Sequence, residues 1–160
     1  DFPDIAFAVA GVPSLGEDFY KNLMPGSEIP VVMNNTYELL GQASAALVTS
    51  GTATLGTALI GTPEVVCYKG GMVSYLIARQ VIKVKFISLV NLIMDRLVVK
   101  ELIQKELNRK NLKAELGLLL NDIHHRRAVI EGFNELRVKL GGSGASAKAA
   151  AVITDFLNKK

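Results

Sequence analysis

Apolar positions along the chain form short continuous runs that alternate with segments of helical spacing. Five runs have the length of buried strands, and the pattern predicts strands at residues 4–10, 29–33, 45–48, 65–68 and 86–90. The helical spacing between them predicts helices at residues 16–23, 36–40, 52–60 and 72–82. Nearly continuous apolar strands that alternate with helices indicate a parallel sheet with helices on both faces. The predicted fold class is therefore α/β, with a Rossmann-like sheet.

Local signals refine the ends of these elements. Ser14 stands three residues before Glu17, a spacing typical of a capping box at the start of a helix. Pro30 lies near the start of the second predicted strand, which favours an edge strand or a strand beginning there. In the second half of the chain, apolar stripes predict helices over residues 98–107, 112–119 and 123–140.

A glycine-rich break, residues 141–144, divides the chain into two predicted units. Residues 1–140 form the Rossmann-like domain, and residues 145–160 form a final helix with an apolar stripe from Ala149 to Leu157. That stripe has two interpretations. The helix packs on its own sheet, or it packs on another domain or on a second copy of the chain.

The turn after the third strand is the first candidate site. It places Ser50, Gly51, Thr52 and Thr54 where the next helix begins. Exposed N–H groups and the positive end of the helix dipole make such a turn suitable for an anion, so we expect a phosphate-bearing ligand there. The alternative is that these residues only cap the helix.

Other turns lie at the same predicted edge, since ligands of open α/β sheets bind beyond the carboxyl ends of the strands. Those turns are residues 11–14, 34–35, 69–72 and 91–96. Taken singly, Lys69 is an ordinary solvated loop lysine and Asn91 an ordinary turn residue. Their shared edge is what favours a functional interpretation.

Composition and charge exclude several classes of function. The chain has 160 residues, 49% hydrophobic, which is one domain with room for a core, and no apolar run approaches the roughly 20 residues of a transmembrane helix. The net charge is +3, and the basic residues are spread along the chain, so the sequence does not indicate a nucleic-acid-binding surface. The single cysteine, Cys67, lies in an apolar run and is expected to be a small buried residue. The chain opens without Met or a secretory signal, so we expect the gene to begin upstream.

Catalytic motifs are hard to find. His124 and His125 stand side by side in a polar stretch, without a partner at metal-ligand spacing, and are expected at the surface. Val48 occupies the place of the first glycine of a nucleophile elbow around Ser50. No Walker lysine follows Gly51, and no residue stands out as a general base.

Several strings together resemble a known family. They are residues 49–55 (Thr-Ser-Gly-Thr-Ala-Thr-Leu), 63–69, 76–79, 87–93 and 96–104. In this combination the chain resembles the C-terminal half of bacterial lipid-A-disaccharide synthases, two-domain glycosyltransferases of the GT-B type. The resemblance implies the GT-B C-terminal fold and a reaction that joins UDP-2,3-diacylglucosamine to 2,3-diacylglucosamine 1-phosphate, releasing UDP.

The resemblance also implies roles for individual residues. Ser50, Gly51, Thr52 and Thr54 would contact the UDP diphosphate, and Tyr68, Lys69 and Met72 would lie near the uracil. Asn91 and Arg96 match positions tied to activity and are the expected catalytic residues. No metal or cofactor is implied beyond the UDP-sugar donor, because the helix dipole and basic side chains suffice to neutralise two phosphates.

Two positions depart from the family pattern. Gly56 stands where the family has a Glu that accepts hydrogen bonds from the ribose hydroxyls, and Leu97 stands where the family has a Glu after Arg96. The resemblance also leaves out the N-terminal domain, which supplies most acceptor contacts and the general base. We therefore expect an excised UDP-sugar-binding half that is inactive alone, altered deliberately or by natural divergence. The alternative is a non-catalytic α/β scaffold whose site is disabled.

The resemblance extends to partners and location. It implies a cytoplasmic enzyme at the inner-membrane face, completed by the N-terminal domain, with a second copy as a further partner through the C-terminal helix. Residues 75–86 mix basic and apolar side chains, which fits a helix lying on a membrane or one covering the sheet.

Overall fold

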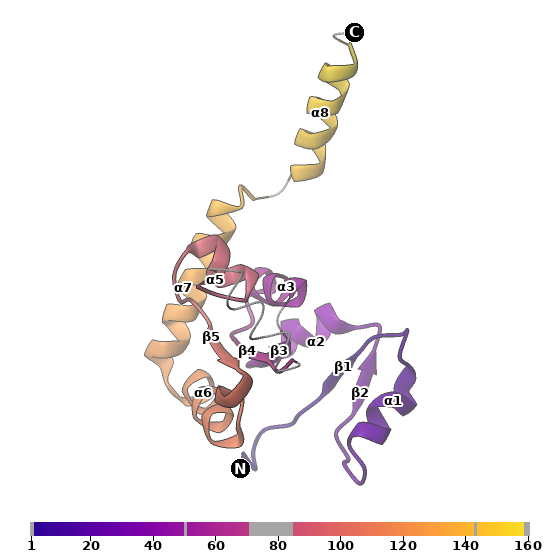
Figure 1. Cartoon of the computed structure of the whole chain (residues 1–160), viewed down its shortest axis with the longest axis vertical. Coiled ribbons are helices and arrows are strands. Elements are labelled where there is room, and N and C mark those ends of the chain that lie inside the picture. The colour runs from indigo at the N-terminus through magenta and orange to yellow at the C-terminus, as the bar shows by residue number, and fades with distance from the viewer. Residues whose placement is uncertain (1, 50, 71–84, 143, 159–160) are drawn as a thin grey trace.

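A computed structural model of the chain describes residues 2–49, 51–70, 85–142 and 144–158 (Figure 1). Within these residues five short strands pair in parallel: β1 (Val9–Gly11), β2 (Val31–Met33), β3 (Ala46–Thr49), β4 (Glu64–Tyr68) and β5 (Lys100–Ile103). They form two sheets, β1-β2 and β3-β4-β5. The predicted α/β class is confirmed, but the described strands form two sheets where the sequence suggested one.

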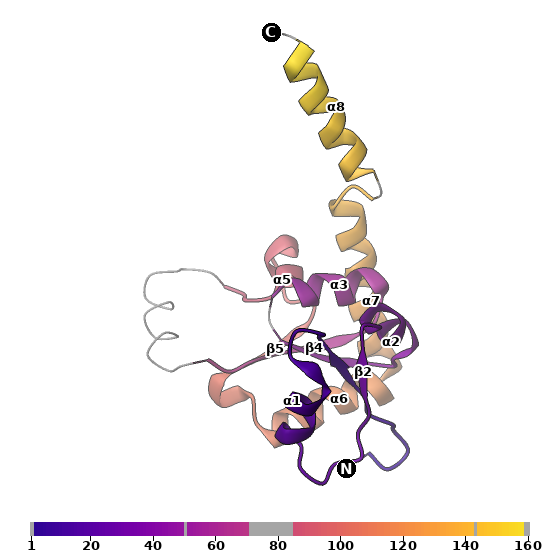
Figure 2. The same ribbon diagram turned by 90° about the vertical axis from the view of Figure 1, so that its right-hand side faces the viewer.

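Helices lie on both sides of the strands. They are α1 (Gly16–Leu23), α2 (Thr36–Gln42), α3 (Thr52–Ile60), α5 (Leu89–Met94), α6 (Arg109–Asn121), α7 (Ile123–Lys139) and α8 (Ala145–Asn158), with a 3-10 turn, η1 (Gln104–Glu106). Figures 1 and 2 show α1 and α6 on one side of the strands, and α3 and α5 on the other. The predicted helix over residues 72–82 lies outside the described residues. Among those residues, no helix is long and apolar enough to cross a membrane.

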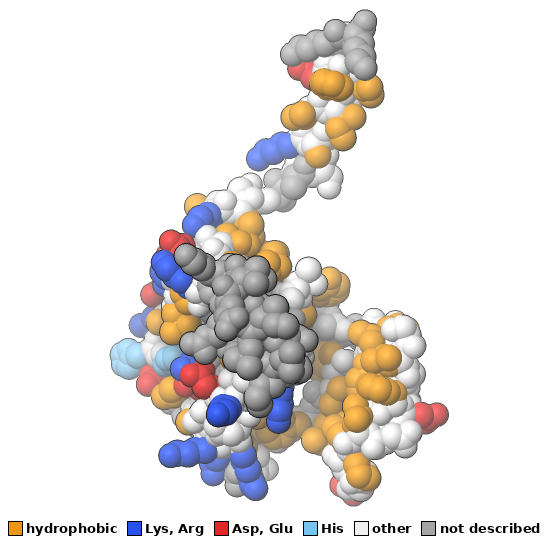
Figure 3. All heavy atoms as spheres, in the orientation of Figure 1, with side chains coloured by type: hydrophobic (Ala, Val, Ile, Leu, Met, Phe, Trp, Pro, Cys, Tyr) orange, Lys and Arg blue, Asp and Glu red, His pale blue; other side chains and the backbone are white. Residues whose placement is uncertain are grey.

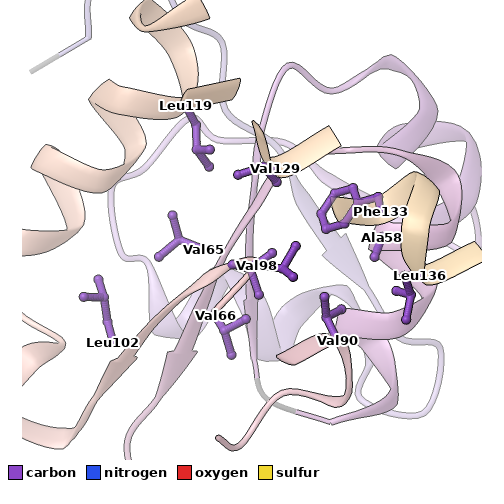
Figure 4. Packing of buried hydrophobic residues seen from close by; sticks show 11 residues of the cluster. Ala58, Val65, Val66, Val90, Val98, Leu102, Leu119, Val129, Phe133 and Leu136 are labelled. Atoms are coloured by element: carbon purple, nitrogen blue, oxygen red, sulfur yellow. The ribbon is translucent and has the colours of Figure 1, made fainter. Parts of the chain in front are cut away.

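The core belongs to the larger sheet and the helices packed on it. Successive residues of β4 point to opposite faces, so Val65 lies toward Leu119 of α6 while Val66 lies toward Val90 of α5 (Figure 4). Phe133 and Leu136 of α7 are fully buried in the same cluster. By contrast, α1 buries none of its residues completely. The stable part of the molecule is thus β3-β4-β5 with α3, α5, α6 and α7.

Two predicted elements in the second half are wrong. Residues 86–90, predicted as a strand, lead into helix α5: the Ser88 hydroxyl accepts the N–H of Asn91 at 3.2 Å and caps it. Residues 98–107, predicted as a helix, form β5 and η1. There, β4 offers a parallel partner, with Val66 in register with Glu101, and this pairing overrides the helical spacing.

The first strand and the first helix also differ from expectation. Strand β1 begins only at Val9, whose N–H donates to the Pro30 carbonyl at 2.9 Å, because β2 supplies no partner to the residues before it. The Ser14–Glu17 capping box is wrong, since Leu15 is the N-cap of α1 and no side chain caps it. Helix α8 projects away from the rest of the molecule (Figures 1 and 2).

Candidate functional site

The turn between β3 and α3 forms as the sequence predicts. Strand β3 ends at Thr49, and Gly51 is the N-cap of α3 with φ 142° and ψ −160°, a conformation that essentially only glycine adopts. Gly51 and Thr52 are exposed, and the first turn of α3 contains no acidic residue. The first N–H groups of α3 and the positive end of its dipole are therefore available to an anion. Ser50 lies outside the described residues.

Thr54 holds this turn together from inside. Its side chain is fully buried, and its hydroxyl donates to the Gly51 carbonyl oxygen at 2.8 Å. The backbone N–H of Thr54 reaches the same oxygen at 3.2 Å. The Thr54 hydroxyl proton is thus already used within the turn, where Thr54 fixes the backbone of Gly51.

Gly56 lies one helical turn after Thr52, and hence on the same face of α3. A Cβ atom built on Gly56 meets no heavy atom within 4 Å outside its own helix backbone and chain neighbours. The position therefore has room for a longer side chain near the start of the helix.

The end of β4 contributes to the same edge. Tyr68 is partly buried and Lys69 is exposed. A Cβ atom on Gly70 would stand 2.8 Å from the Tyr68 hydroxyl oxygen, so the absence of a side chain at Gly70 lets the tyrosine ring lie against the loop. Met72 lies outside the described residues. Cys67 is only partly buried, less than expected, and this burial raises the pKa of its thiol.

Gln104 is a residue that the sequence did not single out as part of the site. It follows β5 directly, and its side-chain amide donates to the Gly70 carbonyl at 3.2 Å, which joins the carboxyl ends of β4 and β5. The signal was present in the sequence, because Gln104 is the polar residue directly after the apolar pair Leu102-Ile103, at the end of the run 98–103. It was lost when that run was interpreted as a helix.

Asn91 and Arg96 do not lie where the sequence placed them. Asn91 is inside α5 and Arg96 follows that helix, so neither stands at the carboxyl end of a strand. Arg96 is exposed and forms an ion pair with Glu135 at 2.7 Å. The placement in a strand-end turn was wrong, whereas a catalytic role for the two residues stays a prediction.

The Asn91 side chain is completely buried and fully hydrogen-bonded. Its oxygen accepts the N–H groups of Val98 and Val99 at 2.8 and 3.0 Å, and its amide nitrogen donates to the Val99 carbonyl at 2.8 Å. The second amide proton goes to Glu101 Oε1 at 2.9 Å. Asn91 therefore connects α5 to the segment that leads into β5.

Glu101 completes this network. The residue is 7% exposed, and its carboxylate accepts the N–H groups of Ile87, at 3.0 and 3.2 Å, and of Ser88, at 2.9 Å. It thus fixes the turn before α5 as well as Asn91. Glu101 stands beside Lys100 between the apolar pairs Val98-Val99 and Leu102-Ile103, and an acid in that place was the signal for such a buried acceptor.

Metal ligands do not gather in the described part of the chain: no three His, Cys, Asp or Glu side chains lie together there. His124 is exposed and His125 partly buried at the start of α7. Their backbone N–H groups donate to Asp122 Oδ1 at 2.9 and 3.0 Å, and these bonds lower the pKa of the Asp122 carboxyl. The histidines are therefore part of a helix start.

Comparison with known proteins places the sequence in one family. The family model described as lipid-A-disaccharide synthetase matches residues 14–153. A lipid-A-disaccharide synthase of Syntrophus aciditrophicus is 37% identical over 158 residues, covering 97% of this chain and 41% of the relative. Synthases of Trichlorobacter lovleyi and Anaeromyxobacter dehalogenans are 30% and 36% identical, covering 98% and 92% of this chain and 42% and 39% of theirs. The chain spans about two fifths of the length of these curated relatives.

Proposed function

The chain belongs to the lipid-A-disaccharide synthetase family, and from this premise we propose that it is the UDP-sugar-binding half of a glycosyltransferase of lipid A biosynthesis. Its ligand is the donor, UDP-2,3-diacylglucosamine, or the product UDP. The acceptor contacts and the general base belong to the rest of the protein, so the chain alone is inactive.

The start of α3 is the observation that carries this proposal. It offers the first N–H groups of α3, which have no acceptor within that helix, next to Gly51, a backbone without a side chain in the way, and a first turn without acids that would repel a diphosphate. Ser50, Thr52 and the turn held by Thr54 surround this position in the sequence. Tyr68, Lys69 and Met72 are proposed to lie near the uracil, which is consistent with Tyr68 and Lys69 at the same edge of the sheet.

Asn91 and Arg96 then have different proposed roles. The buried amide of Asn91 positions the segment before β5, whereas the exposed guanidinium of Arg96 is free to leave Glu135 for an anionic substrate at small cost, because an exposed ion pair contributes only about 0–1 kcal/mol.

Titration of the purified chain with UDP in a calorimeter tests the proposal. The informative variant is Gly56→Glu, which restores the carboxylate expected to accept ribose hydroxyls. A charged hydrogen bond contributes about 1.5 kcal/mol or more, so UDP should bind roughly tenfold more tightly. Failure of the chain and of Gly56→Glu to bind millimolar UDP would reject the proposal.

Gly117→Glu is the matched control for Gly56→Glu. Gly117 lies inside α6, and a Cβ atom there also meets nothing within 4 Å. Both substitutions replace a helical glycine by a better helix former and should stabilise the chain by about 0.5 kcal/mol. Only Gly56→Glu should change the affinity for UDP, and an equal gain at Gly117 would contradict the ribose contact.

A second candidate is the non-catalytic scaffold. It is favoured by Gly56 and by Leu97, which is 59% exposed where the resemblance expects a second carboxylate. The double variant Gly56→Glu, Leu97→Glu separates the two candidates. UDP binding that appears only in the double variant supports a disabled site, and binding by the unaltered chain supports the first proposal.

We propose the cytoplasmic face of the inner membrane as the place of this function, with the remainder of the protein as the partner. Co-sedimentation of the chain with anionic lipid vesicles tests whether residues 1–160 contribute to membrane attachment. If the chain stays in the supernatant at low salt, attachment belongs to the rest of the protein.

A further inference from the structure

The order of the strands leaves a vacant position in the middle of the fold. A Rossmann sheet has the order 3-2-1-4-5-6, all parallel. Here β2-β1 matches the 3-2 part and β3-β4-β5 matches the 4-5-6 part, each in parallel pairing. Within the described residues nothing occupies the first position, which falls between β1 and β3.

The hydrogen-bond directions agree with a vacancy there. Val9 donates to Pro30 on the β2 side, and Ala46 donates to Pro63 on the β4 side. Successive residues of a parallel strand direct their N–H groups to opposite edges, so Ala10 of β1 and Leu47 of β3 present theirs to the position between the sheets. No ladder joins β1 to β3 in the described part of the chain.

An apolar cavity opens on the same position. It has a volume of about 310 Å³, and most of its lining is apolar: Phe2, Ile5 and Phe7 before β1, Leu47 on β3, and Leu112 and Leu116 on α6, which also contributes Arg109 and Lys113. Phe7 and Leu47 remain 41% and 43% exposed. Figure 3 shows hydrophobic side chains along the β1-α1-β2 side of the hollow that separates it from the larger part of the molecule.

The handedness of the fold predicts what covers this cavity. Crossovers between parallel strands are right-handed, so a helix leading from the vacant position to β1 lies on the same face as α1. Figures 1 and 2 place α6 on that face too. A strand in the gap followed by a helix between α1 and α6 would therefore cover Leu47, Leu112 and Leu116.

We propose that the gap between β1 and β3 binds a parallel β-strand, followed by an amphipathic helix, from a part of the same polypeptide outside residues 1–160. The relatives are about two and a half times as long as the matched region, so there is polypeptide to supply it. Phe2 lines the cavity, so a segment that is joined ahead of residue 1 would lie next to the cavity. This proposal stands independently of the ligand of the α3 turn.

A peptide added in trans tests the proposal. The probe has about 35 residues, the length of a strand, a helix and their connections, and takes its sequence from the Syntrophus aciditrophicus relative immediately ahead of the matched region. It is mixed with the whole 160-residue chain, and amide hydrogen exchange is followed by mass spectrometry. We expect saturable binding, with more than tenfold slower exchange at residues 8–10 and 46–49.

Two variants of equal exposure give the control. Leu47→Asp places a charge in the cavity and should weaken peptide binding at least tenfold. Leu59→Asp, at a leucine that is also 43% exposed but lies on α3, should leave binding unchanged. Phe7→Asp serves as a second cavity variant if Leu47→Asp fails to fold, as judged by circular dichroism.

Three outcomes would overturn the proposal. The first is unchanged exchange at residues 8–10 and 46–49 with millimolar peptide. The second is equal protection by a scrambled peptide of the same composition. The third is slow exchange at these residues in the chain alone, becoming slower as the concentration of the chain rises and unchanged when the peptide is added. That result would make a second copy of the chain the occupant of the gap.

Discussion

Glu64, the first residue of β4, is buried in an environment that opposes its charge. It is 1% exposed, and neither carboxylate oxygen has a hydrogen-bond partner within the described residues. Burial raises the pKa of Glu64 from 4.5 to about 9. The folded chain therefore holds this carboxyl protonated at neutral pH, whereas the unfolded chain releases the proton.

The pH dependence of stability follows from this difference. Between pH 4.5 and about pH 9 the Glu64 carboxyl binds a proton in the folded state but not in the unfolded state, so its contribution to stability is fully present below pH 4.5 and is lost as pH rises toward 9. The slope is on the order of 1 kcal/mol per pH unit. We expect Glu64→Gln to remove this slope in urea titrations from pH 5 to pH 8. The exposed Glu131→Gln should keep it, and an unchanged slope in Glu64→Gln would contradict the assignment.

Asn91 is the candidate catalytic residue for which stability and activity are hardest to separate. Its side chain satisfies the N–H groups of Val98 and Val99 in a fully buried site. We expect Asn91→Ala to lower the free energy of unfolding by about 2–4 kcal/mol, since it leaves several buried groups unpaired. Asn134→Ala removes only an exposed acceptor of Arg137 and should cost less than about 1 kcal/mol.

Thermal unfolding of these two variants is therefore needed before any loss of activity at Asn91 is assigned to chemistry. Equal melting temperatures for Asn91→Ala and the unaltered chain would show that the hydrogen bonds of Asn91 contribute little to stability. A loss of activity in Asn91→Ala would then indicate a direct role of Asn91 in catalysis. Arg96→Ala should leave stability nearly unchanged, because its ion pair with Glu135 is exposed.

At the scale of elements, the sequence predicts those whose hydrophobic pattern has one interpretation. The strand–turn–helix around Gly51 is such a case, and β3 and α3 form within a residue of their predicted bounds. Residues 98–107 are the opposite case. Val98, Val99, Leu102 and Ile103 fit either a helix or a strand, and the edge of β4 decides between them. The predicted placement of Asn91 failed for the same reason, since it depended on a strand at residues 86–90.

Helix α8 carries an apolar stripe that the described residues leave uncovered. Val152, Ile153, Phe156 and Leu157 are each at least 60% exposed, and Figure 3 shows hydrophobic side chains along the helix. We expect the chain to associate through α8 as its concentration rises, because pairing two stripes removes this apolar surface from water.

Multi-angle light scattering measures this association. Ile153→Glu, inside the stripe, should return the chain to a monomer. Ala151→Glu introduces the same charge on the opposite side of α8 and should leave association intact. A chain that stays monomeric at high concentration would rule out α8 as a surface for a second copy.

At the scale of the whole molecule, the α/β class was predictable because strands and helices alternate, but the division into two sheets was not. Hydrophobic patterning identifies each strand without saying which strands pair. On its open side β3 pairs with no other described strand, and no local property of Leu47 or Thr49 predicts that edge position.

The two sheets should therefore differ in local stability. All buried members of the main cluster lie between Ala58 and Leu136, whereas α1 has no buried residue and rests on β1 partly through the Tyr20 hydroxyl, which accepts the N–H of Val12 at 2.9 Å. We expect native-state hydrogen exchange to show the β1-α1-β2 unit opening at a free energy at least about 2 kcal/mol below that of β4, β5 and α7.

A pair of phenylalanine variants tests whether this opening is independent of the core. Phe133→Leu removes volume from a fully buried position of α7 and should lower the opening free energy of β4 and β5 by ~1 kcal/mol or more, with exchange in β1 and α1 unchanged. Phe19→Leu, at a position 43% exposed in α1, should speed exchange only in its own unit. If Phe133→Leu accelerates both units equally, the two sheets unfold as one, and the edges of β1 and β3 are coupled without a strand between them.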